Sequence, residues 1–294
     1  MKILTSAITL DRSGVPTYTL TLYRELVSRG HEVTVYSPMA GELAEKMNTI
    51  TSLIEPKEFD VILGQHKTCV INLKKFFPNT PILYLTHGVL PEEEQPVNGM
   101  DYYLPVNEQC AAHLIDFGIS PHQIGIIRDF IDTEEFKPSR PLSDKPKVLF
   151  ISNYKKWRAY QDIEKACRHL GLEFKAVGSP YGRSRNVAES INNADLVISW
   201  GRGILEAMSC GRAVISYNKR MGAGYITPKV YMDNRGYNLG GINSRYMFNV
   251  EELKEEIKKY NPKDGKINRE LVTRYHDTVK CVDQLLAVVD KFKK

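Results

Sequence analysis

Short apolar strands and amphipathic helices alternate along this chain, and that alternation limits the possible folds more than any other feature. In the first half, apolar runs predict strands at Lys2–Ser6, Glu32–Tyr36, Val61–Leu63, Ile82–Leu85 and Tyr102–Val106. Helices are predicted between them, at residues 17–28, 41–47, 70–77 and 108–117. Strands separated by helices in this rhythm build a parallel, doubly wound sheet.

The same rhythm restarts after a proline-bearing segment, residues 137–146, which indicates an interdomain linker. Beyond it, strands are predicted at 148–152, 174–177, 196–198 and 213–216, with helices at 160–170 and 185–192. The 294 residues suffice for two domains. We therefore predict an α/β protein with two Rossmann-like domains, residues 1–140 and 141–294, whose last helix can pack back on the first. Ligands of such sheets bind at the carboxyl ends of the strands, so a cleft between the domains is the expected site.

Composition and charge narrow the function classes. Hydrophobic residues at 42% and charged residues at 26% are ordinary for a globular protein, so a packed core is expected. The net charge of +5 comes with short basic clusters but with no nucleic-acid-binding motif. The five cysteines form no CxxC pair, which favours reduced thiols and a cytoplasmic protein. No apolar run is long enough to span a membrane, and the first residues indicate a strand rather than a signal sequence.

The stretch from Asp195 to Tyr217 contains a strand, a glycine-rich turn, a short helix and a second strand. Gly201 and Gly203 open the helix, and Glu206 lies within its first turns. A glycine-rich turn leaves backbone N–H groups accessible at the positive end of the helix dipole, which suits phosphate groups. A carboxylate just inside the helix can accept hydrogen bonds from the vicinal hydroxyls of a ribose. The pattern indicates a nucleotide diphosphate site, although ordinary α/β crossovers share each part of it.

The first strand-to-helix turn excludes one large class of nucleotide enzymes. Between Thr5 and Pro16 it holds a single glycine, Gly14, and no G-x-G-x-x-G. That motif lets the backbone approach the pyrophosphate of a dinucleotide. A nicotinamide or flavin dehydrogenase is therefore not expected.

Several segments, in order, resemble the GT-B glycosyltransferases, most closely the retaining nucleotide-sugar transferases of family 4. The segments that carry the resemblance are Ser13-Gly14-Val15, LYRELVSRGHEVTVYSP, Thr86-His87-Gly88, IIRDFIDTEEFKP from Ile126, ADLVIS, and LEAMSCGRAVIS. Together they run nearly end to end. The resemblance implies that Ser13 and Gly14 belong to the family's glycine-rich first loop, that His87 faces the acceptor cleft, and that Glu206 holds the donor ribose.

The sequence also departs from the family pattern. The family has a first glutamate eight positions before the second, and that position is Ile198. Ser152-Asn153 stands where the family has Gly-Arg, and Arg158 stands where it has a lysine, with Lys156 nearby. A diphosphate still requires cationic donors, which an arginine can supply as a fork.

The expected chemistry follows from the leaving group. Transfer from a nucleotide sugar requires that the departing diphosphate be stabilised. The candidates are Arg158, Lys156, Arg202 and the N–H groups at Gly201 and Gly203. The alternative explanation for Lys155, Lys156 and Arg158 is that they are exposed loop charges. His87 would bond a sugar hydroxyl or assist proton loss, or else serve as a structural histidine. The acidic residues 92–94 are expected to form a solvated turn, with binding of acceptor hydroxyls as the alternative. No D-x-D triplet occurs, so neither metal nor cofactor is expected.

The sequence thus predicts a cytoplasmic glycosyltransferase whose partners are a nucleotide-sugar donor and a sugar or lipid-linked acceptor. A lipid-linked acceptor would add a peripheral contact with the membrane. Retention of configuration is implied by the resemblance. Two alternatives stay open: a catalytically silent homologue that scaffolds a partner transferase, and an epimerase acting on the sugar nucleotide.

Overall fold

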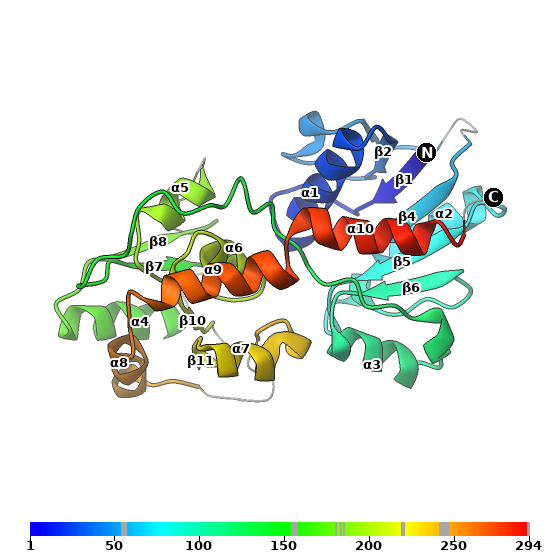
Figure 1. The fold of residues 1–294 in the computed structure, drawn as a ribbon. Helices are drawn as coiled ribbons and strands as arrows, with labels where there is room; N and C mark the ends of the chain where they lie inside the picture. Colours follow the sequence, from blue (N-terminus) through cyan, green and yellow to red (C-terminus); the bar gives the residue numbers. More distant parts are fainter. Residues whose placement is uncertain are drawn as a thin grey trace. The chain divides into compact units, whose positions relative to one another are not determined.

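The chain folds into two α/β units, each built around its own sheet (Figure 1). Unit 1 comprises residues 1–130 and 278–294, and unit 2 comprises residues 131–277. The computed structural model describes the chain except for residues 54–57, 154–157, 180, 183, 185, 219–220, 241–246 and 293–294. The side chain of Arg158 also lies outside the described part.

Unit 1 contains a six-stranded sheet in the order β3-β2-β1-β4-β5-β6, with all neighbours parallel. Its strands are β1 (Lys2–Ser6), β2 (Glu32–Tyr36), β3 (Thr49–Ile50), β4 (Val61–Gln65), β5 (Ile82–Thr86) and β6 (Tyr102–Pro105). Its helices are α1 (Gly14–Ser28), α2 (Lys67–Phe76), α3 (Glu108–Asp116) and α10 (Thr278–Val289). Short 3-10 turns occupy η1 (Ala44–Lys46), η2 (Glu92–Glu94) and η3 (Pro121–Gln123).

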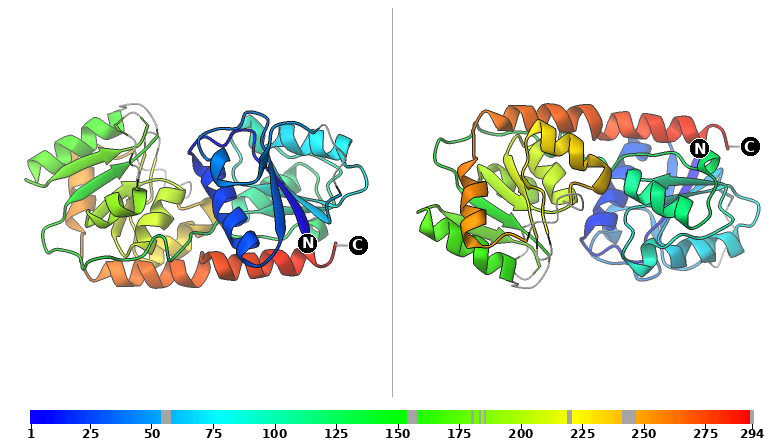
Figure 2. Two further views of the ribbon diagram at one scale, coloured as in Figure 1. Left: turned by 90° about the horizontal axis from the view of Figure 1, so that it is seen from above. Right: turned by 90° about the horizontal axis from the view of Figure 1, so that it is seen from below.

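Side chains along the strands of unit 1 alternate between two separate hydrophobic cores. Ile3 packs with α1 and α10, whereas its neighbour Leu4 packs with α2 and α3. Side chains of successive strand residues point to opposite faces, so a strand that is apolar throughout supplies both cores. The sheet of unit 1 is therefore covered on both sides, as the doubly wound pattern predicts (Figure 2).

Unit 2 contains a five-stranded sheet in the order β11-β10-β9-β7-β8. Its strands are β7 (Val148–Ile151), β8 (Phe174–Val177), β9 (Leu196–Ser199), β10 (Ala213–Ser216) and β11 (Gly224–Tyr225). Its helices are α4 (Arg158–His169), α5 (Val187–Asn192), α6 (Arg202–Ser209), α7 (Pro228–Asn234), α8 (Val250–Lys258) and α9 (Asp264–Tyr275), with a 3-10 turn η4 (Arg235–Tyr237). Helices α5, α6, α7 and α9 pack on one face of this sheet, and α4 and α8 pack on the other.

The predicted α/β fold with two doubly wound units is confirmed, with two local differences. The second sheet is mixed, because the edge strand β11 runs antiparallel to β10. The helix predicted at residues 41–47 is only the turn η1, because Gly41 has a φ of 131° and Met47 is extended, with φ −139° and ψ 158°, so neither end of the segment is helical.

The proline-bearing segment 137–146 is part of unit 2 rather than a linker, so the boundary predicted at residue 140 is misplaced. The side chain of Asn192 makes two hydrogen bonds to the segment. Its NH₂ group donates to the carbonyl of Lys137 at 3.0 Å, and its oxygen accepts the N–H of Ser139 at 3.0 Å. Arg140 pairs with the buried Asp195 at 2.7 Å. These polar contacts fasten the segment to α5 and β9, and the chain passes between units at residues 130–131 and 277–278 instead.

The last helix belongs to unit 1. Helix α10 contributes Cys281, Val282 and Leu285 to the core that α1 also lines. At its start, Arg29 at the end of α1 bonds the Asp283 carboxylate and donates to the carbonyl of Val279 at 2.9 Å. The return of the C-terminal helix to the first unit therefore rests on both apolar and charged contacts.

Candidate functional site

The carboxyl end of β9 leads almost directly into α6. Gly201 caps that helix with φ 60° and ψ −132°, a conformation that favours glycine, and it supplies no side-chain acceptor to the helix N-terminus. A Cβ atom on Gly203 would lie 2.4 Å from the Ser199 hydroxyl oxygen, which itself donates to the carbonyl of Ile151 at 3.1 Å. The two glycines thus let the helix start close to the strand ends, with no side-chain hydrogen bond from its N-cap residue. Such a helix start suits an anion.

Glu206 lies one turn into this helix, on the same side as Arg202. The Nε atom of Arg202 is 3.3 Å from a carboxylate oxygen of Glu206, and the side chains are 9% and 13% exposed. Both charges are therefore largely shielded from water. Low exposure strengthens hydrogen bonds that either group makes to a ligand.

The neighbouring strand ends show equally close backbone packing. After β8, a Cβ atom on Gly178 would lie 1.9 Å from the carbonyl oxygen of Ser152. The Ser179 amide donates to the side chain of Asn153 at 3.2 Å. The carboxyl ends of β7 and β8 are therefore held together by direct contacts, beside the strand that carries α6.

A strained segment follows η4 at the same edge. Asn238 and Leu239 adopt φ values of 57° and 54°, which are uncommon for residues other than glycine. The hydroxyl of Ser216, at the end of β10, donates to the carbonyl of Leu239 at 2.5 Å. A Cβ atom on Gly240 would approach the Trp200 ring to 3.0 Å, so this segment packs against the residue that precedes Gly201.

In unit 1, His87 follows β5 and is held from several directions. Its Nε2 lies 2.9 Å from the side-chain oxygen of Gln65, at the end of the adjacent strand β4. Its backbone N–H donates to Glu94 at 2.7 Å. The Tyr18 ring from α1 meets the imidazole edge-on, with ring centroids 4.6 Å apart. His87 itself is only partly buried.

Glu94 and His66 complete this cluster, and neither stands out in the sequence. Burial raises the pKa of Glu94 to about 7, although the N–H groups of His87 and Gly88 oppose that rise. His66 has a φ of 63°, accepts the Ile8 N–H on Nδ1 at 2.9 Å, and lies 3.7 Å from Glu94. Burial lowers the pKa of His66. The prediction of a solvated acidic turn is wrong for Glu94, which is 5% exposed.

This burial predicts a pH dependence of folding stability. Because the native pKa of Glu94 is raised from 4.5 to about 7, its contribution is complete below pH 4.5 and is lost as the pH rises toward 7. Over that window the contribution of Glu94 to the free energy of unfolding should fall by about 3 kcal/mol. Glu94→Gln stays neutral and should lack this fall, as urea unfolding of both proteins across the window would measure.

The control for that comparison is Glu92→Gln, because the Glu92 side chain is 78% exposed and pairs with Lys67 at the surface. This variant should follow the wild-type pH profile. Parallel profiles for wild type and Glu94→Gln would show that burial does not shift the titration of Glu94.

The structure brings together four of the predicted donor-site residues, Gly201, Arg202, Gly203 and Glu206, all at α6. Ser13 and Gly14 lie in unit 1, where Ser13 is the exposed N-cap residue of α1. Arg158 is the first residue of α4 in unit 2, and Lys156 lies outside the described residues.

Sequence reasoning missed Gln65, His66 and the burial of Glu94. A usable sign was present, because GQH follows directly on the apolar run VIL at the end of a predicted strand. Polar residues at that place belong to the carboxyl edge of the sheet, where ligands of α/β proteins bind.

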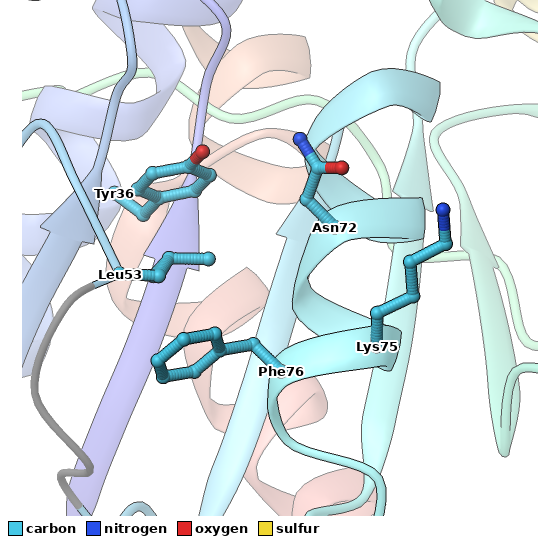
Figure 3. Close-up of a pocket in the computed structure, with 5 residues that line it drawn as sticks. All are labelled: Tyr36, Leu53, Asn72, Lys75 and Phe76. Carbon is cyan, nitrogen blue, oxygen red and sulfur yellow. The ribbon is translucent and has the colours of Figure 1, made fainter.

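A separate hollow of about 310 Å³ lies elsewhere in unit 1 and is lined by Tyr36, Leu53, Asn72, Lys75 and Phe76 (Figure 3). The lining side chains come largely from α2, and none of the predicted site residues is among them. Within the described residues, no three His, Cys, Asp or Glu side chains are grouped as a metal site would need. In the same part of the chain, no helix is long and apolar enough to cross a membrane.

No protein-family profile and no curated protein matches the sequence, but solved structures match it over almost its whole length. Anabaena HepE in complex with UDP and glucose has a TM-score of 0.71 at 14% identity, over 99% of this chain and 100% of that chain. Sucrose-phosphate synthase from Thermosynechococcus elongatus has a TM-score of 0.69 at 14% identity, over 99% and 98%. WaaG, a glycosyltransferase involved in lipopolysaccharide biosynthesis, has a TM-score of 0.66 at 14% identity, over 98% and 99%.

At these identities the shared feature is the fold. The chain has the GT-B fold, with a six-stranded parallel sheet in unit 1 and a mixed sheet in unit 2. The resemblance noted in the sequence is confirmed at this level.

Proposed function

We propose that the protein is a glycosyltransferase that moves a sugar from a nucleotide-diphosphate sugar to a hydroxyl group of an acceptor. The observation that carries this proposal is the start of α6, where a glycine cap that offers no side-chain acceptor and the carboxylate of Glu206 lie on one short helix. Support also comes from the solved structures of the same fold, since HepE has been crystallised with UDP and with UDP-glucose.

In this proposal the donor occupies the carboxyl edge of the second sheet. The diphosphate accepts hydrogen bonds from the amides at Arg202 and Gly203, and the helix dipole adds to the attraction. Two vicinal ribose hydroxyls donate to Glu206, whose geometry is held by Arg202. Arg158 and Lys156 are proposed as further cations for the diphosphate, because transfer requires that the leaving group be stabilised.

The reaction proposed is a single exchange of bonds at the anomeric carbon. The bond to the diphosphate oxygen breaks, a bond to the acceptor oxygen forms, and the acceptor proton passes to the departing phosphate. His87 is proposed to bond a sugar hydroxyl during this exchange. Retention of configuration, independence from metal, and a role for Ser13 and Gly14 in binding the donor are part of the same proposal.

The acceptor is proposed to be a glycan, a small molecule or a lipid-linked sugar reached from the cytoplasm. A lipid-linked acceptor would place the protein at the membrane surface as a peripheral component. An assay that offers soluble and vesicle-bound acceptors separately would distinguish these cases.

The proposal is tested by thermal unfolding with a panel of nucleoside diphosphates, followed by turnover with the matching nucleotide sugar. A ligand that binds only the native protein, at about 100 times its Kd, adds about 2.7 kcal/mol to stability. We expect one nucleotide to raise the melting temperature, and its release from the sugar nucleotide to depend on added acceptor. An absence of any shift across the panel would contradict a donor site at α6.

A second candidate is a catalytically silent homologue that scaffolds a partner transferase. The specific observation in its favour is that Arg202 already engages Glu206 at 3.3 Å, in a chain where Ile198 replaces the first glutamate of the family pattern. Tight partner binding without turnover would support this candidate. An isomerised donor in the same assay would instead indicate an epimerase.

A further inference from the structure

Gln65 has a fully buried amide side chain at the end of β4, beside the strand that leads to His87. Its exposed fraction is 0%. Its amide nitrogen donates to the hydroxyl of Thr5 at 3.2 Å and to that of Thr19 at 3.1 Å, and its oxygen lies 2.9 Å from Nε2 of His87. A buried amide with every group bonded is well suited to hold a neighbour in one geometry.

The two threonines fix which way this amide faces. Thr5 donates its hydroxyl proton to the carbonyl of Leu63 at 2.9 Å, and Thr19 donates to that of Val15 at 2.9 Å. A hydroxyl has one proton, so each of these oxygens can only accept from Gln65. The NH₂ group must therefore face the threonines, and the carbonyl oxygen must face His87.

The orientation of the amide in turn fixes the tautomer of His87. A carbonyl oxygen only accepts hydrogen bonds, so the proton of the neutral imidazole must be on Nε2. Nδ1 then carries the lone pair. The backbone of the same residue is fixed independently, because Glu94 accepts its N–H at 2.7 Å.

We propose that Gln65 is a positioning residue for His87, which it holds as the Nε2–H tautomer so that Nδ1 is the basic nitrogen in glycosyl transfer. This inference rests on the proposed function for its catalytic meaning, but the tautomer itself does not depend on activity. A sugar hydroxyl that meets the ring at Nδ1 would find an acceptor, and a ring of the opposite tautomer would offer a donor.

The test is a long-range proton–nitrogen NMR spectrum of protein labelled with ¹⁵N-histidine, in which His87→Gln identifies the signals of His87. We expect the neutral wild-type ring to show the Nε2–H pattern. We expect Gln65→Leu, which has no acceptor at this position, to lose that pattern or mix it with the other tautomer. A wild-type ring with the proton on Nδ1 would overturn the inference without any variant, as would an unchanged pattern in a folded Gln65→Leu protein.

A matched control exists in the same unit. Gln95 places its side-chain oxygen 3.1 Å from Nε2 of His113, and its amide nitrogen donates to the carbonyls of Val89 and Pro91. Gln95→Leu should alter the signals of His113 and leave the tautomer of His87 as in wild type. A change at His87 in this control would mean that loss of a glutamine amide elsewhere in the unit also disturbs the ring.

Measurements of transferase activity separate this inference from the proposed function. With the preferred donor, Gln65→Leu should lower kcat by about tenfold, which is the effect of about 1.4 kcal/mol on the barrier when one hydrogen bond to the sugar is misplaced, while the donor KM changes little. An inactive wild type with the expected tautomer would sink the proposed function and leave the positioning of His87 intact. An active wild type with full kcat in Gln65→Leu would overturn the positioning role alone.

Discussion

Replacing Glu206 by alanine should abolish the thermal stabilisation that the preferred nucleoside diphosphate gives to the wild-type protein. Two ribose hydroxyls bonded to one carboxylate each contribute about 1.5–3 kcal/mol, because hydrogen bonds to charged groups are the stronger ones. Their joint loss weakens nucleotide binding by about a hundredfold or more. Isothermal titration with the same nucleotide would measure that loss directly.

The variant also removes the partner of Arg202, so its fold must be checked by circular dichroism and by melting without ligand. Glu206→Gln keeps the shape of the side chain and removes only the charge, and it should lose most of the nucleotide shift as well. A folded Glu206→Ala protein that is still fully stabilised by nucleotide would show that the ribose does not bind at Glu206.

Glu256 offers a matched control within unit 2. Its side chain is also 13% exposed, it also pairs with a nearby basic residue, Lys259 at the cap of helix α8, and it accepts the N–H of Tyr225 on the edge strand β11. Glu256→Gln therefore removes an equally buried and paired carboxylate away from α6. We expect it to lower stability while leaving the nucleotide shift unchanged.

The strands were predictable from the sequence because their apolar runs are continuous and short. Residues 2–6, 32–36 and 174–177 were predicted with the bounds that the structure gives. Both faces of each sheet are covered by helices, so buried strands need no polar alternation and stand out clearly. The placement of the residues proposed for the donor site at α6 was also predictable, because they lie within one helix and the turn before it.

The cluster around His87 was not predictable, because it joins segments that are far apart in the chain. Gln65 and Glu94 reach His87 from β4 and from η2, and only the pairing of β4 with β5 places those ends together. No local sequence pattern determines which residues of two neighbouring strands are paired. A run of three glutamates also resembles a solvated turn, and only the fold shows that the third is buried.

The misplaced linker has a similar cause. Prolines mark residues 137–146 as irregular, which is correct, but irregular backbone is not always a free connection. This segment crosses the surface of unit 2, where buried polar side chains hold its carbonyls. The largest of these side chains is Arg212, which is 1% exposed.

Arg212 follows Gly211, just after the end of α6. All three nitrogens of its guanidinium group donate to backbone carbonyls. It donates to Arg140 O at 2.7 Å, to Cys210 O at 2.8 Å and to Ala194 O at 3.2 Å. Burial lowers its pKa, which is the expected effect of removing a cation from water. The group joins the irregular segment to the ends of α5 and α6.

Arg212→Met should therefore lower the free energy of unfolding of unit 2 by about 3–5 kcal/mol, because the carbonyls of Arg140 and Cys210 lose their donor and gain none. The carbonyl of Ala194 loses one of two donors, since it also accepts from Arg140 at 3.0 Å. Both tryptophans of the chain, at positions 157 and 200, fall within the residue range of unit 2, so intrinsic fluorescence during urea unfolding follows this unit. Lys175→Met is the control, since that side chain is 75% exposed and its pairing with Glu173 is a surface contact.

Arg212→Lys separates charge from geometry in the same measurement. A lysine keeps the buried cation but has a single ammonium group in place of the planar fork, so it cannot reach all three carbonyls together. If the fork is what holds segment 137–146, the lysine variant should lose nearly as much stability as the methionine variant. If it instead matched the wild type, a buried positive charge alone would suffice, and the three hydrogen bonds would not account for the position of the segment.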